Sequence, residues 1–176
     1  MTGAWRALAL AAALTVTLTG GAGAQMTNFA KGHDSSQPIE ITSDTLEVKQ
    51  DENTAIFRGR VDAVQGDMNL RADELVVHYT TDDAGNNTIS VIEATGNVFI
   101  ASPDSLAQGD HGVYDVTAET IDLDGSVVLT RDDNVIRGDR LRLNLATGKS
   151  KMQSNVAKKG GNGRVKALFV PKPKDQ

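Results

Sequence analysis

Hydrophobic and polar residues alternate in short runs along the chain from Ile39 onward. The runs are bounded by Gly, Asn and Asp, and no stretch between residues 39 and 149 has a convincing helical period. Strict alternation over short runs is typical of β-strands with one buried face, because successive side chains of a strand point to opposite sides. All four prolines lie outside these runs, which also fits strands. The pattern therefore predicts an all-β domain over residues 39–149.

Two short motifs recur within this alternation. A small residue followed by Asp opens a strand four times, at residues 43–48, 72–77, 109–114 and 138–143. Between these copies, Gly-x-Val recurs at Gly59, Gly96 and Gly125. Successive aspartates of the first motif are 29, 37 and 29 residues apart, and each glycine precedes the next aspartate by 14 residues. A period of about 29 residues with two strand signals predicts stacked strand pairs in a narrow, elongated β-structure.

The long middle interval contains eight additional residues, Thr80 to Asn87, whose turn-forming sequence predicts an insertion after a strand. The repeat alone fits either a parallel solenoid or an antiparallel meander. At the repeated glycines we expect a bulge or bend in the strand, in preference to a close approach by a ligand. The repeated aspartates open strands, so they are expected to accept hydrogen bonds from nearby backbone amides at a turn. Metal binding is not expected, because they recur once per unit and have no clustered partners.

The ends of the chain differ from the repeats. Residues 1–24 have a short polar start, an apolar run from Ala7 to Leu18 and the small residues Ala22-Gly23-Ala24, which predict a cleavable secretory signal rather than an uncleaved anchor. The signal predicts a location outside the cytoplasm. The remaining segments are expected to be a flexible lead-in over 25–38, a basic Gly-rich linker over 150–163, a terminal edge strand over 164–171 and a tail over 172–176.

Composition removes several classes of function. The chain of 176 residues has no cysteine, which excludes disulfides, thiol catalysis and cysteine-ligated zinc. Aromatic residues make up only 4%, so the core must be built of aliphatic side chains. A net charge of −5 argues against a general nucleic-acid binder. That charge is uneven, since residues 25–148 carry a net −13 and residues 149–176 a net +7.

Candidate catalytic and metal-binding groups are sparse. The three histidines, His33, His78 and His111, are widely spaced and have no neighbour in sequence that suggests a nucleophile or a zinc site. The stretch from Asp122 to Gly125 looks like the start of a calcium loop but lacks the later acidic ligand. We therefore expect no enzyme activity, no metal and no other cofactor. A β-helical enzyme acting on polysaccharide and a purely structural filament remain as alternatives.

The residues expected to face inward are largely aliphatic. They form either a closed sandwich core or, if the two sheets splay, a trough open to a ligand with long alkyl chains. The candidate lining residues are Ile41, Leu46, Val48, Phe57, Val61, Met68, Leu70, Leu75, Val77, Tyr79, Ile92, Val98, Ile100, Tyr114, Ile121, Val127, Leu129, Leu141, Leu143 and Leu145.

Several stretches together resemble one known family. They are Ile41-Thr42-Ser43-Asp44, the residues AIFRGRV at 55–61 and the basic, Val-rich end at 163–171, found in order behind a signal sequence. Over about residues 38–171 the chain resembles the OstA-like family, to which the periplasmic lipopolysaccharide transport protein LptA belongs. The resemblance implies a slightly twisted β-jellyroll of V-shaped antiparallel strands with a hydrophobic groove.

The resemblance also implies a function and partners. Family members hold the lipid A acyl chains of lipopolysaccharide in the groove and stack head to tail into a bridge across the periplasm. The bridge connects an LptC-like subunit of the inner-membrane exporter to an LptD-like outer-membrane translocon. The cleavable signal disfavours LptC itself, and the chain is too short for a full translocon.

Basic residues near the C-terminus are further candidates for contacts. They are expected to meet either phosphates on the lipid headgroup or the acidic end of the next subunit. These residues are Lys158, Lys159, Arg164 and Lys166.

Overall fold

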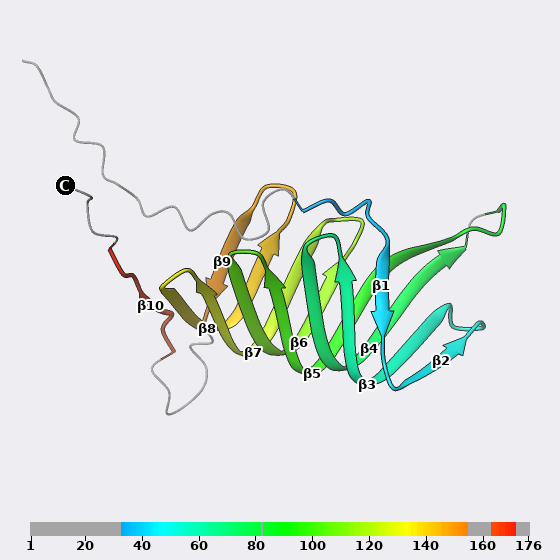
Figure 1. Cartoon of the computed structure of the whole chain (residues 1–176), viewed down its shortest axis with the longest axis horizontal. Coiled ribbons are helices and arrows are strands. Elements are labelled where there is room, and N and C mark those ends of the chain that lie inside the picture. The colour runs from blue at the N-terminus through cyan, green and yellow to red at the C-terminus, as the bar shows by residue number, and fades with distance from the viewer. Residues whose placement is uncertain (1–32, 82, 155–162, 172–176) are drawn as a thin grey trace, which may run out of the picture.

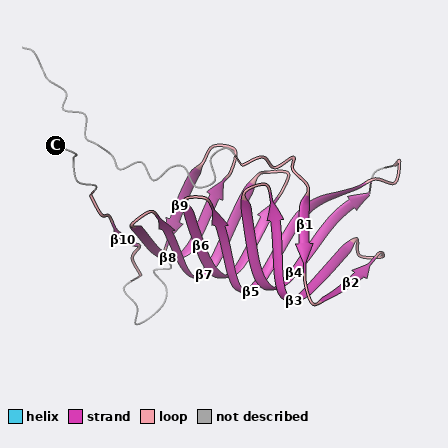
Figure 2. Cartoon of the chain, in the orientation of Figure 1, coloured by secondary structure: helices cyan, strands magenta, loops and turns pink. Residues whose placement is uncertain are grey.

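The structure is a computed structural model that describes residues 33–81, 83–154 and 163–171. These residues form one antiparallel sheet of ten strands, and no helix occurs among them (Figures 1 and 2). The strands are β1 (Ile39–Thr42), β2 (Thr45–Lys49), β3 (Thr54–Gln65), β4 (Met68–Thr81), β5 (Asn87–Ser102), β6 (Ser105–Asp115), β7 (Thr120–Arg131), β8 (Asn134–Asn144), β9 (Lys149–Gln153) and β10 (Lys166–Leu168). The predicted all-β fold is confirmed, and of the two arrangements that the repeat allowed, the strands adopt the antiparallel one.

Six long strands, β3 to β8, are bent near the middle. One half of each strand lies in one arm of the molecule, and the other half lies in a second arm. The second half of β3 pairs with β1, whereas its first half pairs with β2. At the other end of the sheet, the first half of β8 pairs with β10 and its second half with β9. We call the side that begins at β1 and ends at β10 arm one, and the side that begins at β2 and ends at β9 arm two. Figure 1 shows the bent strands nested along the long axis of the molecule.

The repeated glycines and aspartates together make the bends. On β5, Gly96 and Asn97 have φ angles of 77° and 46°, and the pairing with β6 shifts register between Thr95 and Val98. The Asp73 carboxylate of β4 lies where a Gly96 side chain would be and accepts a hydrogen bond from Asn97 Nδ2 at 2.8 Å. Asp44 at Gly59 and Asp110 at Gly125 repeat this arrangement. The predicted bend at these glycines is confirmed.

The repeated aspartates bond to a wider set of groups than predicted. Asp110 accepts a hydrogen bond from the backbone amide of Ser126 at 3.3 Å, as expected. Asp44, in contrast, pairs with the Arg60 guanidinium, which lowers the pKa of its carboxyl group. The fourth copy, Asp139, accepts a hydrogen bond from the Ser154 hydroxyl at 2.7 Å. At Asp44, Asp73 and Asp110 the common role is therefore to hold the bend of a neighbouring strand, and the donor varies with the residue that follows the bend. Asp139 instead holds the residue just beyond the end of β9.

The inserted residues lengthen one hairpin without disturbing the repeat. β4 and β5 continue to the pair Thr81 and Asn87, and β5 is the longest strand, with 16 residues. Figure 1 shows this hairpin extending beyond the body of the molecule at the end where β2 lies. The insertion predicted over residues 80–87 is therefore the tip of a strand pair.

The chain ends depart from the predicted segments in two places. β9 occupies the start of the range 150–163 that was expected to be a linker, because residues 149–153 continue the alternation and pair with β8. β10 covers only three residues of the expected strand 164–171 and already pairs with β8. The expected signal (1–24), most of the lead-in (25–32), part of the linker (155–162) and the tail (172–176) lie outside the described residues.

Candidate functional site

The inner face of each arm carries an apolar row that crosses every strand. Residues directly opposite one another on paired strands share a face of the sheet, so the pairing register traces these rows. In arm one the row is Ile41, Ala63, Leu70, Ile100, Ala107, Leu129, Ile136 and Ala167, from β1 to β10. In arm two it is Leu46, Phe57, Leu75, Ala94, Gly112, Leu123, Leu141 and Met152, from β2 to β9. No polar side chain interrupts either row.

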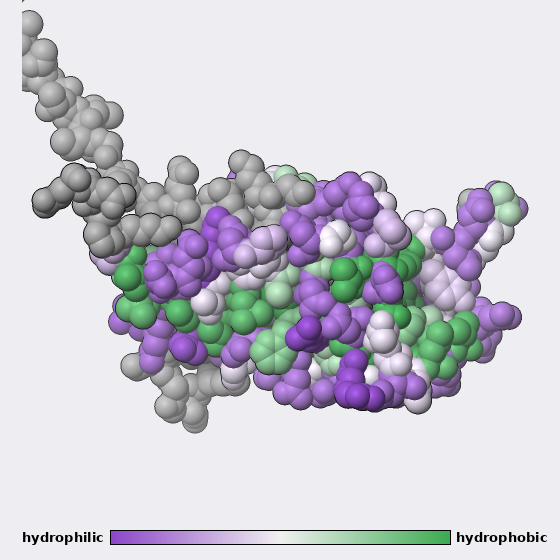
Figure 3. All heavy atoms as spheres, in the orientation of Figure 1, coloured by the Kyte–Doolittle hydropathy of each residue, from purple (hydrophilic) through white to green (hydrophobic). Residues whose placement is uncertain are grey.

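The interior is packed in the middle of the molecule and uncovered at its ends. Leu75, Ile100 and Leu141 are 0% exposed, and the two arms share one hydrophobic core. At the β2 end, by contrast, Leu46 is 55% and Val48 54% exposed. Figure 3 shows hydrophobic surface over β2 at one end and near β10 at the other. Both sequence alternatives therefore occur, a closed core in the middle and an open apolar surface at the edges.

The predicted lining residues lie at three depths in this interior. Leu46 and Val48 are exposed on β2, while Ile41, Phe57 and Tyr79 are partly buried. The buried members are Val61, Met68, Leu70, Leu75, Val77, Ile92, Val98, Ile100, Tyr114, Ile121, Val127, Leu129, Leu141, Leu143 and Leu145.

Several lining residues were missed by the sequence prediction. The inner rows also contain the small residues Ala63, Ala94 and Ala107, and the buried Leu123. Their positions follow from the same alternation, so the period-two signal could have found them. Gln65 is different, because a polar residue at an inward position gives no sequence signal of its role. It is only 3% exposed at the end of β3.

The basic end is only partly within the described structure. Arg164 and Lys166 are exposed there, whereas Lys158 and Lys159 lie outside the described residues. Lys166 stands opposite Arg137 of β8, a residue that the sequence did not single out. These two cations border an open hollow of about 210 Å³ whose other lining residues are Val135, Ala167 and Leu168. The hollow combines positive charge with apolar side chains.

We call the opening between the tips of the two arms the mouth. Two polar side chains, one from each arm, meet there. The Tyr114 hydroxyl of arm two donates a hydrogen bond to Gln65 Oε1 of arm one at 3.2 Å. Burial, with a smaller contribution from the charge of Glu119, raises the pKa of Tyr114 to about 12. Tyr114 is therefore a neutral hydrogen-bond donor at any physiological pH, and its bond links the two arms.

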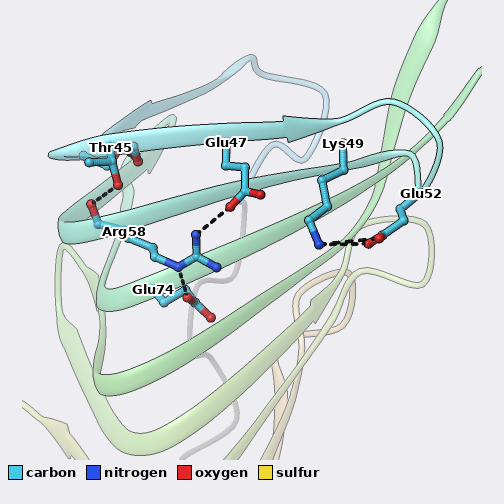
Figure 4. A network of polar contacts seen from close by, with 7 residues as sticks. Thr45, Glu47, Lys49, Glu52, Arg58 and Glu74 are labelled. Carbon is cyan, nitrogen blue, oxygen red and sulfur yellow. Dashed lines mark hydrogen bonds and ion pairs between the residues drawn. The ribbon is translucent and has the colours of Figure 1, made fainter.

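The outer faces are covered by paired charges. On arm two, Arg58 donates to Glu47 at 2.9 Å and to Glu74 at 2.6 Å, and these hydrogen bonds raise the pKa of Arg58 (Figure 4). Asp122 and Asp124, the acids of the calcium-like stretch, are paired with Arg142 and Arg140. Within the described ranges, no group of three His, Cys, Asp or Glu side chains is placed to hold a metal. The carboxylates there hold strands together.

No helix in the described parts of the chain is long and apolar enough to cross a membrane. The fold and the interior together define an elongated, V-shaped β-jellyroll with a continuous apolar inner face. Residues 40–149 match the family described as LptA/(LptD N-terminal domain) LPS transport protein. Because the match covers most of the chain, the chain belongs to this family of lipopolysaccharide transport proteins.

Individual relatives agree with this assignment. An uncharacterized protein of Rhizobium meliloti is 38% identical over 123 residues, which cover 67% of this chain and 66% of the relative. The lipopolysaccharide export system protein LptA of Escherichia coli is 25% identical over 81% of this chain and 76% of its own length. The LPS-assembly protein LptD of Nitrosomonas eutropha is 35% identical over 50% of this chain, but the match spans only 12% of that much longer protein.

A solved structure confirms the fold. LptH of Pseudomonas aeruginosa, described as the LptA homologous periplasmic component of the conserved lipopolysaccharide transport device, superposes with a TM-score of 0.67. The superposition covers 79% of this chain and 99% of LptH at 20% identity. The predicted β-jellyroll and the resemblance to the LptA family are therefore confirmed.

Proposed function

We propose that this protein carries lipopolysaccharide through the periplasm by holding the lipid A acyl chains between its two arms. The observation that carries the proposal is the pair of apolar inner rows, which cross all strands without a polar interruption and end uncovered at both edges. In this proposal, the lining residues predicted from the sequence are the ones that contact the acyl chains. Family membership supports the substrate class, and the periplasmic LptH supports the location.

The energetics explain why such a carrier is needed. Exposing one methylene group to water costs about 0.8 kcal/mol, so an acyl chain of about a dozen methylenes costs roughly 10 kcal/mol. A lipid with several such chains does not cross an aqueous space unaided. An apolar surface that runs from one end of the protein to the other lowers this barrier without forming any covalent bond.

Loading requires the arms to move apart in the middle of the molecule. A cavity between the arms, lined by Met68, Leu70, Ile92 and Tyr114 among others, measures about 20 Å³, which is room for about one water molecule. The uncovered end at Leu46 and Val48 on β2 offers the first contact for an acyl chain. We therefore propose that acyl chains enter at an edge and separate the arms as they move inward.

Copies of the protein stack head to tail in this proposal. The two edges of the sheet lie at opposite ends of the long axis, and each presents strands with one unpaired side (Figure 1). Residues 39–53, around β1 and β2, contain five acids and one lysine, whereas residues 149–154 and 163–171 contain four basic residues and no acid. Opposite charges favour joining β1 and β2 of one copy to β9 and β10 of the next by strand addition.

The same edges provide the contacts with other proteins of the pathway. At the ends of a stack, we propose that one edge meets an LptC-like subunit of the inner-membrane exporter and the other an LptD-like outer-membrane translocon. The homology between this chain and the LptD relatives supports a shared strand arrangement at such a contact. The basic residues at the β10 edge contact either the next subunit or phosphates of the lipid headgroup.

Photo-crosslinking from two phenylalanine positions tests the acyl-chain site. Phe57 lies in the inner row of arm two near the open end, whereas Phe99 is 39% exposed and lies between the inward-facing Val98 and Ile100 on β5. Replacing either one by a photoreactive phenylalanine analogue is a similarly small change. Lipopolysaccharide adducts are expected from position 57 and not from position 99. Equal labelling from both, or adducts from position 99 alone, would reject the interior as the binding site.

A further inference from the structure

Residues 33–38 cross the mouth between the tips of the two arms. On one side of the mouth lies Gln65, at the end of β3 in arm one, and on the other side lies Glu119, in the turn between β6 and β7 of arm two. Figure 1 shows the segment in blue along the upper side of the molecule, where it leads into β1. We call residues 33–38 the strap.

The strap is bound to arm one chiefly through the buried side chain of Gln65, and His33 Nδ1 also lies 3.9 Å from the Asp67 carboxylate in the turn between β3 and β4. Gln65 Nε2 donates hydrogen bonds to the carbonyl oxygens of Ser35 at 2.9 Å and Gln37 at 3.0 Å. His33, whose side chain is 0% exposed, places Nε2 3.1 Å from Gln65 Oε1. Since Gln65 Oε1 is an acceptor, this contact requires the proton on Nε2 and leaves His33 Nδ1 without a hydrogen-bond partner.

The strap also reaches arm two. The Ser35 hydroxyl donates a hydrogen bond to Glu119 Oε1. Beneath this contact, the Tyr114 hydroxyl donates to the same Gln65 Oε1 that faces His33. Gln65 is therefore the point at which the strap, arm one and arm two meet, and the strap holds the two tips together.

The space below the strap is apolar. The cavity under Gln65 and Tyr114 is lined on one side by Met68 and Leu70 of arm one and on the other by Ile92 of arm two. The strap itself, His-Asp-Ser-Ser-Gln-Pro, has one aliphatic residue, Pro38, and that residue is exposed. A segment held by a few polar contacts and little apolar area has low local stability, so it can detach without unfolding the sheet.

We propose that the strap is a displaceable cover over an acyl-chain slot between Met68 and Leu70 on one arm and Ile92 and Tyr114 on the other. An acyl chain that enters the slot takes the place of the strap at the mouth. The chain gains contacts with the lining side chains that the strap does not make. This inference rests on the proposed acyl-chain carrier function and adds a step of regulation at the same site.

A closed strap lowers the apparent affinity for the ligand, since only the open fraction of molecules can bind. If about one molecule in a hundred has an open strap, the affinity is about a hundred times lower than that of a permanently open form. Weakening the strap should therefore tighten binding, which a purely structural segment would not do.

A reversible cross-link tests this proposal, and the absence of native cysteine makes the chemistry specific. The variant Ser35→Cys/Glu119→Cys, joined by a short bis-methanethiosulfonate reagent, keeps the strap across the mouth. Its matched control is His78→Cys/Glu93→Cys, which joins two neighbouring strands whose side chains approach to 3.4 Å. Binding of a fluorescent long-chain fatty acid is measured before joining, after joining and after reduction.

We expect joining at the strap to weaken binding at least tenfold, reduction to restore it and the control to bind as before joining. If the joined strap variant bound the probe as well as before joining, the role of the strap as a cover would be rejected and the carrier function would stand. No binding by the wild-type protein would overturn both. As a second variant, Gln65→Leu removes the hydrogen bonds to the strap at similar volume and is expected to bind the probe more tightly. Weaker binding of the fatty acid by Gln65→Leu would count against the proposal that the strap covers the slot.

Discussion

At Gly96 the backbone has a φ of 77°, and an added Cβ would overlap Asp73 Oδ2 and lie 3.0 Å from Asp73 Cγ. The substitution Gly96→Ala therefore combines backbone strain with a collision. Gly85 is a matched control, because its φ is 84° but nothing lies within 4 Å of an added Cβ. We expect Gly96→Ala to lower the free energy of unfolding by about 3 kcal/mol and Gly85→Ala by about 1 kcal/mol. Urea titrations measure both, and equal losses would refute the role of the Asp73 contact.

Tyr114 gives a pH dependence to the mouth between the arms. Its pKa is raised from 10.0 to about 12, so the unfolded chain loses this proton at lower pH than the folded protein does. The stabilisation is complete below pH 10 and is lost as the pH rises through 12. The full loss is about 2–3 kcal/mol for a shift of about two units.

The measurement uses the other tyrosine as a handle. The chain has two tyrosines, so the variant Tyr79→Phe leaves Tyr114 as the phenol whose ionisation changes the near-ultraviolet absorbance. We expect this phenol to titrate near pH 12 in the folded protein. Titration near pH 10 would show that Tyr114 is exposed and that the mouth is open in solution.

At the scale of elements, β2 is an edge strand whose apolar residues Leu46 and Val48 are left uncovered. Leu46 ends the apolar row of arm two, and a charge there would be buried without a partner when another copy stacks on this edge. We expect Leu46→Glu to weaken self-association at least tenfold in sedimentation velocity experiments. The control Lys49→Gln lies on the same strand and loses only the exposed pair with Glu52 (Figure 4). A wild-type protein that stays monomeric at high concentration would reject stacking altogether.

The elements also show where alternation is a sufficient signal. β3 to β8 were predictable because each has one buried face and a motif that repeats in register. β9 was missed, because five residues of alternation beside a Gly-rich stretch did not separate a strand from a linker. β10 lies within the predicted terminal strand over 164–171, but its length of only three residues is set by its pairing with β8. The break between β1 and β2 at Ser43 and Asp44 has a similar cause, since the chain there crosses from one arm to the other.

At the scale of the whole molecule, charge is uneven along the sequence. Residues 25–148 carry a net −13 and residues 149–176 a net +7. Reversing charge at the described part of the basic end, with Arg164→Glu and Lys166→Glu together, should weaken either self-association or lipopolysaccharide binding at low salt. The effect should shrink at about 1 M salt, where the screening length falls to about 3 Å. No change in either property at low salt would remove the basic end from the proposed contacts.

The sequence by itself determined the strands, their repeat and the apolar composition of the inner face. It did so because a strand with one buried face requires period two, and a bend at each unit requires a glycine beside an aspartate. Only the tertiary structure decided that the interior is packed in the middle and uncovered at both edges, and that Gln65 joins both arms beneath the strap. The separation of the arms depends on how much the strands bend and twist together, and Gln65 meets residues up to 49 positions away. Neither the separation of the arms nor the contacts of Gln65 can be predicted from a local pattern of residues.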